Sequence, residues 1–124
     1  MEKTVLFDAS KEPLGRMAAK IAHLLMGKHR PSFARNDGGG TRIAVSHADR
    51  VVLTGRKWNQ KRYYRHSGYL GNLREYSAAW MRTHDSRQLV RHAVHGMLPK
   101  NRTRQRRMRQ LAIYRGEAPA SALR

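Results

Sequence analysis

The chain has 124 residues, of which 26 are Lys or Arg and 8 are Asp or Glu, so its formal net charge at pH 7 is +18. This length fits one domain, and the absence of cysteine excludes disulfides, thiolate nucleophiles and zinc sites built from cysteine. Ordinary solubility needs a net charge of only about 2–8, so the excess predicts a polyanionic partner, and nucleic acid fits better than a membrane because the basic residues are spread over several segments.

The first elements expected along the chain are a strand over Thr4–Asp8 and a helix that begins at Leu14. Pro13 fits the first turn of that helix, and Gly27 fits its C-terminal cap. The predicted inner face carries apolar residues at helical spacing, namely Leu14, Met17, Ala18, Ile21 and Leu25. The opposite face is basic and is consistent either with solvent exposure or with binding; it carries Arg16, Lys20 and His23.

Residues 28–40 are expected to form a loop that ends in three consecutive glycines, Gly38, Gly39 and Gly40. A flexible turn fits these glycines better than a phosphate-binding loop, because neither GxxxxGK[ST] nor GxGxxG is present. A compact basic group at the start of the loop is the stronger candidate for binding, and it consists of Lys28, His29 and Arg30.

Two further strands are expected at Arg42–Ser46 and Val51–Thr54, joined by a tight connection. Lys61–His66 alternates with period two, so Tyr63 and Tyr64 should point to opposite sides of an extended segment. One of the two tyrosines is expected to pack inward, and the pattern does not tell which. Residues 67–72 contain two glycines and are expected to form a loop.

The composition changes from apolar to basic directly after Gly55. Basic side chains follow with no acidic residue among them: Arg56, Lys57, Lys61, Arg62, Arg65 and His66. Aromatic side chains lie between and after them: Trp58, Tyr63, Tyr64 and Tyr69. Because cations bind phosphates and flat rings stack on bases, this segment predicts a surface that binds nucleic acid.

Two helices are expected next. The first is short, runs over Ser77–Met81 with Ser77 as its cap, and places Trp80 in the core. In the second, Asp85 and Gln88 have the spacing of a capping box, and Gly96 is expected to end the helix. Its predicted inward residues are Leu89, Val90, Ala93, Val94 and Met97.

The segment Lys100–Arg115 contains seven Lys or Arg residues and no acid. A helix over Thr103–Leu111 would have little apolar surface to bury, so we expect it to be ordered by binding phosphates. A short strand at Ile113-Tyr114 and a tail over residues 118–124 complete the chain, which leaves residues 1–117 as one domain. The order strand, helix, strand, strand and then helices indicates an α/β fold with helices over a small mixed sheet.

No pattern typical of an enzyme or a metal site is present. His66 and Ser67 are adjacent, so their side chains point apart, and no GxSxG motif occurs. His92 and His95 lie three residues apart without a nearby third ligand, so no metal is expected. No apolar run approaches the roughly 20 residues of a membrane span, and the N-terminus is unlike a signal or transit peptide, so we expect a soluble intracellular protein.

Several motifs in order resemble the bacterial form of the large ribosomal subunit protein thirteen family. They are Leu14-Gly15-Arg16, Gly27-Lys28-His29, Val52-Leu53-Thr54-Gly55-Arg56-Lys57, Tyr63-Tyr64-Arg65-His66-Ser67-Gly68-Tyr69 and Gly96-Met97-Leu98-Pro99-Lys100-Asn101. The resemblance covers residues 4–119. It implies a three-layer α/β/α sandwich around the small mixed sheet, with basic loops and a basic C-terminal helix.

The resemblance further implies a structural constituent of the large subunit, in the ribosome of the cytoplasm, that binds ribosomal RNA and helps early assembly. Neighbouring ribosomal proteins are its implied protein partners, and no catalytic residue, cofactor, metal, small-molecule substrate, membrane or homo-oligomer is expected. The expected RNA-binding residues, of which the last four rest on charge alone, are Lys28, His29, Arg30, Arg56, Lys57, Lys61, Arg62, Tyr64, Arg65, His66, Ser67, Gly68, Tyr69, Lys100, Asn101, Arg102, Arg104, Arg106, Arg107 and Arg109.

The chain departs from the family pattern at its end, where Ala118-Pro119-Ala120 replaces a His-Pro-His element, and at Thr103-Arg104, which replaces Leu-Gly. Two other readings of the sequence stay open at this point. One is a non-ribosomal regulator that binds RNA or DNA, since charge and aromatic residues alone permit it. The other is an enzyme acting on nucleic acid, with His66 as a proton carrier.

Overall fold

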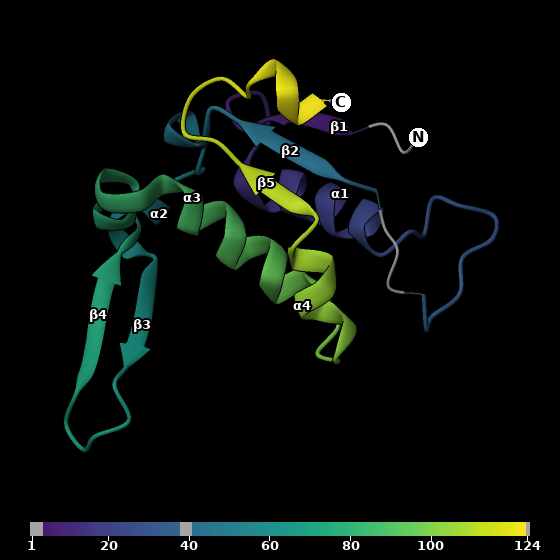
Figure 1. Cartoon of the computed structure of the whole chain (residues 1–124). Coiled ribbons are helices and arrows are strands. Elements are labelled where there is room, and N and C mark those ends of the chain that lie inside the picture. Colours follow the sequence, from purple (N-terminus) through teal and green to yellow (C-terminus); the bar gives the residue numbers. More distant parts are fainter. Residues whose placement is uncertain (1–3, 38–40, 124) are drawn as a thin grey trace.

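A three-stranded parallel sheet lies at the centre of the computed structural model, which describes residues 4–37 and 41–123. The strands β1 (Val5–Asp8), β2 (Ile43–Ser46) and β5 (Leu111–Ile113) are arranged in the order β1-β2-β5 (Figure 1). All residues of β2 are buried, as expected for a central strand covered on both faces.

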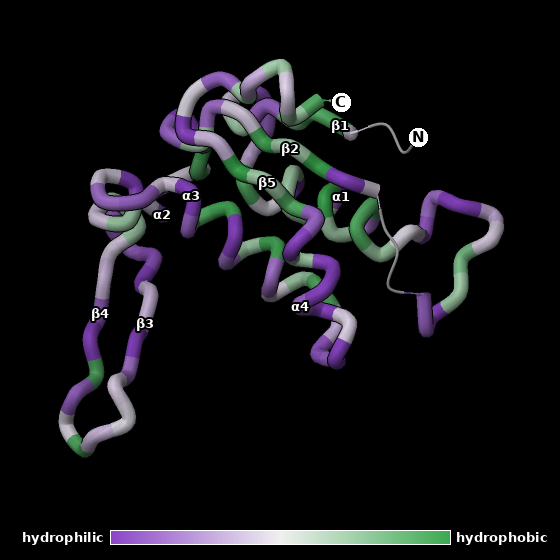
Figure 2. Tube along the Cα trace, in the orientation of Figure 1, coloured by the Kyte–Doolittle hydropathy of each residue, from purple (hydrophilic) through white to green (hydrophobic). Residues whose placement is uncertain are grey.

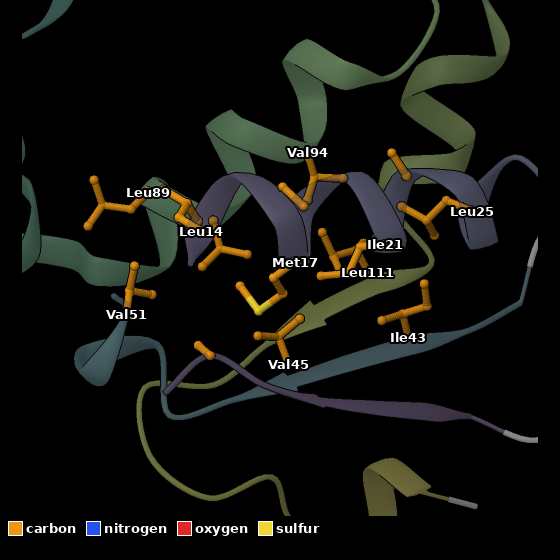
Figure 3. Close-up of a cluster of buried hydrophobic side chains, with 14 of the residues drawn as sticks. Leu14, Met17, Ile21, Leu25, Ile43, Val45, Val51, Leu89, Val94 and Leu111 are labelled. Carbon is orange, nitrogen blue, oxygen red and sulfur yellow. The ribbon is translucent and has the colours of Figure 1, made fainter. Parts of the chain in front are cut away.

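Helices α1 (Leu14–Leu25) and α3 (Ala78–Met97) pack together on one side of this sheet (Figures 1 and 3). A 3₁₀ turn, η2 (Ala120–Leu123), lies over the opposite face, where only a tail was predicted. The predicted α/β class is confirmed, and the layer opposite α1 is thin.

Helix α1 confirms the predicted amphipathic helix, because its buried residues are the five predicted from their spacing together with Ala22. Gly27 has a φ of 77°, its N–H donates to the carbonyl of Leu24 at 3.0 Å, and Lys28 N–H donates to the carbonyl of His23 at 3.3 Å. These bonds form a Schellman motif, which glycine favours because it adopts the left-handed conformation at little cost.

The predicted strand at Val51–Thr54 is wrong, because the segment makes only an isolated parallel bridge, between Val52 and Pro13. The N–H of Leu14 donates to the carbonyl of Val52 at 3.0 Å. The ladder stops there because Pro13 has no N–H and α1 begins at the next residue. Val51 nevertheless belongs to the core, with 3% of its surface exposed.

A β-hairpin made of β3 (Arg62–His66) and β4 (Leu73–Ser77) projects away from the central sheet (Figure 1). Strand β3 was predicted and β4 was not. Within the described residues the hairpin is antiparallel and the central sheet is parallel. The sequence predicted one mixed sheet, and the structure has the two kinds of pairing in separate sheets. Tyr63 is the inward tyrosine, at 7% exposure, and Tyr64 is 64% exposed.

Helix α3 joins the two helices that were predicted at this position. Asp85 has non-helical angles (φ −155°, ψ 92°) and kinks the chain where the second helix was expected to start. The Asp85 carboxylate accepts the N–H of Arg87 at 3.2 Å, which caps the second part, and Ser77 Oγ accepts the N–H of Trp80 at 3.1 Å, which caps the first. Asp85 is therefore the cap, as predicted. Its carboxylate accepts the N–H of Arg87, whereas in the predicted capping box it would accept the N–H of Gln88.

Three predictions for α3 are wrong. Gly96 does not end the helix, which continues to Met97 and stops at Leu98, whose extended angles are those favoured before Pro99. Met97 is therefore 43% exposed instead of inward. Trp80 is also outside the core, at 40% exposure.

The core lies between α1, α3 and the inner face of the central sheet, as the labelled side chains in Figure 3 show. Met17, Ile21 and Leu25 of α1 face Ile43 and Val45 of β2, and each is at most 1% exposed. Leu89 and Val94 of α3 pack against the same cluster with 0% exposure. Within the described residues no helix is long and apolar enough to cross a membrane.

We expect Leu89→Ala to lower the free energy of unfolding by about 2–5 kcal/mol, because truncating a fully buried side chain leaves a cavity. Leu70→Ala is the matched control, since Leu70 is fully exposed and the same truncation should cost less than about 0.5 kcal/mol. Chemical denaturation followed by circular dichroism measures both variants. Equal losses would contradict this assignment of the core.

Candidate nucleic-acid interface

The predicted binding residues fall on separate parts of the molecule. We call the first part the hairpin surface, and it consists of Arg56, Lys57, Lys61, Arg62, Tyr64, Arg65, His66 and Tyr69. We call the second part the α4 surface, after helix α4 (Thr103–Met108), and it consists of Lys100, Arg102 and Arg104, with Arg91 and His95 from α3. Arg106 and Arg109 are exposed on another side of this segment, where they line a separate hollow beside β2 and β5. Figure 2 shows hydrophilic segments along the hairpin and α4, set apart from the apolar central strands.

The hairpin surface begins at a turn that presents two cations. Gly55 has a φ of 64°, which reverses the chain before the one-turn helix α2 (Lys57–Gln60). Arg56 and Lys57 are both exposed, and Lys57 Nζ donates to Thr54 Oγ1 at 3.2 Å. Arg56 occupies the position before the helix, and its side chain is exposed at the turn.

Cations continue along β3. Lys61 Nζ lies 5.7 Å from the centroid of the Tyr63 ring, and Arg62 forms an exposed ion pair with Glu75 at 3.3 Å. Arg65 pairs directly across the hairpin with Arg74. Like charges opposite each other on two strands repel, so this pair favours an anion placed over it.

The tip of the hairpin presents Tyr69 at 75% exposure and Leu70 at full exposure. Gly68 has a φ of 94°, and its N–H donates to His66 Nδ1 at 2.9 Å. This hydrogen bond fixes the His66 ring against the turn and makes its Nδ1 an acceptor. Ser67 and Gly68 therefore form the turn, and the exposed ring of Tyr69 is available to stack on a base.

An aromatic stack beside the hairpin was not predicted as part of the site. The Tyr76 and Trp80 rings are stacked with centroids 4.3 Å apart, and Trp80 and His84 are stacked at 3.8 Å. A hollow of about 320 Å³ next to this stack is also lined by Tyr64 and Arg65. The spacing of four residues between Trp80 and His84 on one helix is the sequence signal for that half of the stack. Tyr76 lies in β4, so its contact with Trp80 depends on how the hairpin meets α3.

The α4 surface is built around α4 (Thr103–Met108), which is shorter than the helix predicted. Asn101 caps it by accepting the N–H of Arg104 at 3.1 Å, so its amide oxygen is used within the chain. Arg102 and Arg104 line a hollow of about 460 Å³ together with Arg91 and His95 from α3. Burial, and then the charge of Arg104, lowers the pKa of His95 below its ordinary value of 6.5, which favours its neutral form.

Arg107 differs from the other predicted contacts because only 2% of its surface is exposed. Its terminal amino group donates to the carbonyl of Asp37 at 3.0 Å, which ties α4 to the loop after α1. The guanidinium therefore holds two segments together instead of facing a partner, and we leave it out of the proposed interface.

The basic group after α1 is only partly available. Lys28 is exposed, whereas His29 Nε2 lies 3.2 Å from Thr41 Oγ1 in a hydrogen bond. Arg30 is half-buried and has interactions within the protein. The three glycines predicted to form the loop tip, Gly38, Gly39 and Gly40, lie outside the described residues.

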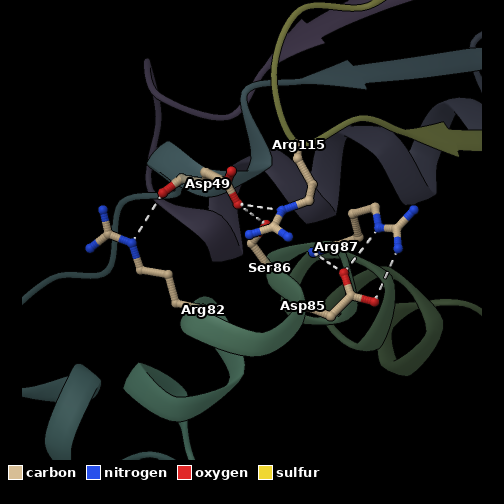
Figure 4. Close-up of polar contacts among 6 residues, drawn as sticks. All are labelled: Asp49, Arg82, Asp85, Ser86, Arg87 and Arg115. Atoms are coloured by element: carbon tan, nitrogen blue, oxygen red, sulfur yellow. Dashed lines mark hydrogen bonds and ion pairs between the residues drawn. The ribbon is translucent and has the colours of Figure 1, made fainter.

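A polar network centred on Asp49 holds the elements around the hairpin in place (Figure 4). The Asp49 carboxylate accepts hydrogen bonds from the hydroxyl of Ser86 and from Arg115 Nε, the latter at 3.0 Å. Its main-chain carbonyl accepts Arg82 Nε, also at 3.0 Å. These bonds join the 3₁₀ turn η1 (Ala48–Arg50) to α3 and to the segment after β5.

The bond from Ser86, followed by that from Arg115, holds the pKa of Asp49 below its ordinary value of 3.8, against the opposing effect of burial. Asp49 therefore stays ionised at neutral pH and keeps both arginines in place. Ser86 itself is fully buried at the kink of α3, so its hydroxyl depends on this carboxylate for a partner.

Comparison with known proteins gives one consistent result. A profile of the family described as Ribosomal protein L13 matches residues 2–120. The "Large ribosomal subunit protein uL13" of Syntrophobacter fumaroxidans is 46% identical over 114 residues, which cover 92% of this chain and 80% of that protein. The protein of the same name from Chloroflexus aggregans is 47% identical over 111 residues, covering 90% of this chain and 78% of that protein. The one from Clostridioides difficile is 43% identical over 114 residues, covering 92% and 80%.

We expect Ser86→Ala to destabilise the fold by about 0.5–1.5 kcal/mol at neutral pH, because it removes a hydrogen bond to a carboxylate that is itself partly exposed. The folded pKa of Asp49 lies below the unfolded one, so its stabilising effect is present above the ordinary pKa and is lost as the pH falls through the folded pKa. The difference between Ser86→Ala and wild type should therefore shrink below about pH 4.

Denaturation curves at several pH values measure this difference. Ser67→Ala is the control, because Ser67 is exposed in the hairpin turn and should behave like wild type at every pH. A Ser86→Ala difference that stays constant down to low pH would show that the hydroxyl does not act through Asp49.

Proposed function

The chain belongs to the ribosomal protein L13 family, and from this membership we propose that it binds large-subunit ribosomal RNA through the hairpin and α4 surfaces. Members of the family are structural ribosomal proteins without enzymatic activity. The alternative in which His66 carries protons in an enzyme is therefore wrong. We further propose that the protein acts in the ribosome of the cytoplasm, beside neighbouring ribosomal proteins.

The observation that carries the RNA-binding proposal is the set of exposed, unneutralised cations on the hairpin surface. Arg62 is the hairpin-surface cation that has an acidic partner within the described residues, and Arg65 instead faces Arg74. A folded domain keeps such uncompensated charge at a cost, which a polyanion removes. Tyr64 and Tyr69 lie among these cations with exposed rings, which suits single-stranded bases as well as phosphates.

The proposed mechanism is electrostatic clamping. Each Lys or Arg that neutralises a phosphate of a duplex-like helix releases counterions and steepens the salt dependence of binding by about 0.9 in a log–log plot. The hairpin and α4 surfaces lie apart on one rigid core, so one molecule is able to hold two RNA segments in a set arrangement (Figure 1). A protein that fixes distant RNA segments in this way is suited to act early in assembly of the subunit.

We expect Arg56→Glu combined with Lys57→Glu to reduce incorporation into the large subunit while the isolated protein stays folded, because both side chains are exposed at the turn before α2. Mass spectrometry of purified subunits measures the amount incorporated, and circular dichroism checks the fold. Arg16→Glu combined with Lys11→Glu is the control, with the same charge change at exposed positions in and before α1. Normal incorporation of the double variant at the turn would count against this part of the interface.

We expect Tyr64→Ala to weaken binding to the ribosomal RNA by about 1–3 kcal/mol, because its exposed ring offers a face to an unstacked base. Tyr64→Phe keeps the ring and should bind almost as wild type does. Titration of the labelled RNA at fixed salt measures both affinities. Equal weakening of the two variants would point to the hydroxyl group, and unchanged binding of Tyr64→Ala would remove this residue from the interface.

A further inference from the structure

An open hollow of about 500 Å³ lies where α2, α3 and the segment after β5 meet. Its size falls within the range of pockets that hold small ligands or a single group of a larger one. Two arginines and a tryptophan from different elements contribute to its lining, which consists of Asp49, Trp58, Ala79, Arg82, Thr83 and Arg115. None of these residues belongs to the hairpin surface or the α4 surface.

The Arg82 side chain is held in place from two directions. Its Nε donates to the carbonyl of Asp49 at 3.0 Å, and its guanidinium carbon lies 5.0 Å from the centroid of the Trp58 ring. The second contact has the geometry of a cation–π interaction. Arg82 therefore loses little conformational freedom when its remaining donors bind a ligand.

Arg115 is held by the same residue from the other side, as Figure 4 shows. Its Nε donates to the carboxylate of Asp49 at 3.0 Å, and that carboxylate is fixed in turn by the buried hydroxyl of Ser86. Asp49 thus positions both guanidinium groups, one through its side chain and one through its main chain. The two arginines come from α3 and from the segment after β5, so only the folded chain brings them to one hollow.

The hollow has more hydrogen-bond donors than acceptors. A guanidinium carries five N–H donors, and Nε supplies the bond to Asp49 in each arginine. Among the described residues the terminal amino groups of Arg82 and Arg115 have no hydrogen-bond partner. Asp49 is the only acid in the lining, so the hollow is left with one net positive charge.

A phosphate group matches this arrangement, because it offers several acceptor oxygens in the geometry that guanidinium forks bind. The flat outer face of Arg82, backed by Trp58, also suits stacking on a base. An acidic protein segment would supply carboxylates, whereas each nucleotide supplies an anion and a flat base in one unit, so RNA fits better. Trp58 lies in α2 between Lys57 and Lys61, so the hollow adjoins the hairpin surface and a strand bound there can continue into it.

We propose that this hollow binds one nucleotide of the ribosomal RNA, with Arg82 and Arg115 as the cations that contact it. The proposal rests on the RNA-binding function proposed above. It joins Trp58, which the sequence placed in a nucleic-acid-binding segment, to Arg82 and Arg115, which the sequence did not indicate. In this role Asp49 and Ser86 are positioning residues, because they act on the RNA only through the two arginines.

The test uses the full-length protein and a transcript of the large-subunit ribosomal RNA, with affinity measured over a series of salt concentrations. Arg82→Gln and Arg115→Gln should each weaken binding and reduce the log–log salt slope by about 0.9 to 1. Arg16→Gln is the matched control, since it removes one exposed positive charge from α1 and should leave the slope unchanged. Slopes for Arg82→Gln and Arg115→Gln equal to that of the control would overturn the proposal.

A second variant avoids the hydrogen bonds of Asp49, in case loss of an arginine disturbs the fold. Thr83 lines the hollow from the exposed side of α3, so Thr83→Glu adds a negative charge and should weaken RNA binding, whereas Thr83→Gln should not. A third measurement places the ligand directly. With Trp80→Phe the only tryptophan left is Trp58, whose emission should change when RNA saturates the protein. An unchanged emission, or equal binding of the two Thr83 variants, would overturn the site.

The outcomes separate this proposal from the function on which it rests. If the wild-type protein fails to bind the transcript, RNA binding itself is wrong and the site is wrong with it. If wild type binds and Arg56→Glu with Lys57→Glu weakens binding while the variants in the hollow do not, only the hollow is excluded. If the hollow variants bind the transcript normally but are lost from subunits in a salt wash, the hollow contacts a neighbouring protein instead.

Discussion

Burial of one face of α1 between the central sheet and α3 is the contact on which the remaining structure depends. The chain carries a formal charge of +18, and such a chain repels itself when it becomes compact. Burial of the apolar residues of α1, β2 and α3 offsets this repulsion. Met17, Ile21 and Leu25 of α1 are at most 1% exposed. Because the hairpin leads into one end of α3 and α4 follows the other, this contact also sets the positions of both basic surfaces.

Among the described residues, the few acidic side chains pair with some of the exposed cations and leave most of those on the hairpin unpaired. Asp49 holds Arg82 and Arg115, and Asp85 holds Arg87 at the kink of α3. The bonds of Asp49 connect elements that are distant in the sequence, whereas Asp85 and Arg87 lie two residues apart in α3. The projecting hairpin has Glu75 as its acid, so its cations stay available for a partner. The few acids thus decide which of the exposed cations are paired within the protein and which stay available for a partner.

Arginines that look alike in the sequence have different places in the fold. Arg107 lies in the α4 segment among residues that look equivalent in the sequence, yet it is buried and bonded to the carbonyl of Asp37. Arg65 and Arg74 oppose each other on an exposed hairpin, where the repulsion costs little in water and is removed by an anion. The repelling charges of the hairpin therefore lie outside the core.

Local patterns correctly predicted α1, β1, β2 and the two parts of α3, because helical spacing, caps and alternation depend on neighbouring residues. They also showed where basic and aromatic residues gather along the chain. The motifs also identified the family. Tertiary structure decided what neighbouring residues do not encode. Val51–Thr54 has the composition of a strand but lies beside Pro13, which offers no N–H to extend the ladder. Strand β4 is polar and depends on pairing with β3, and Tyr63 faces inward because His92 of α3 packs against its ring. Arg82, Arg115 and Trp58 come together only through Asp49 and the folding of α3 over α2, since long-range contacts depend on the whole chain.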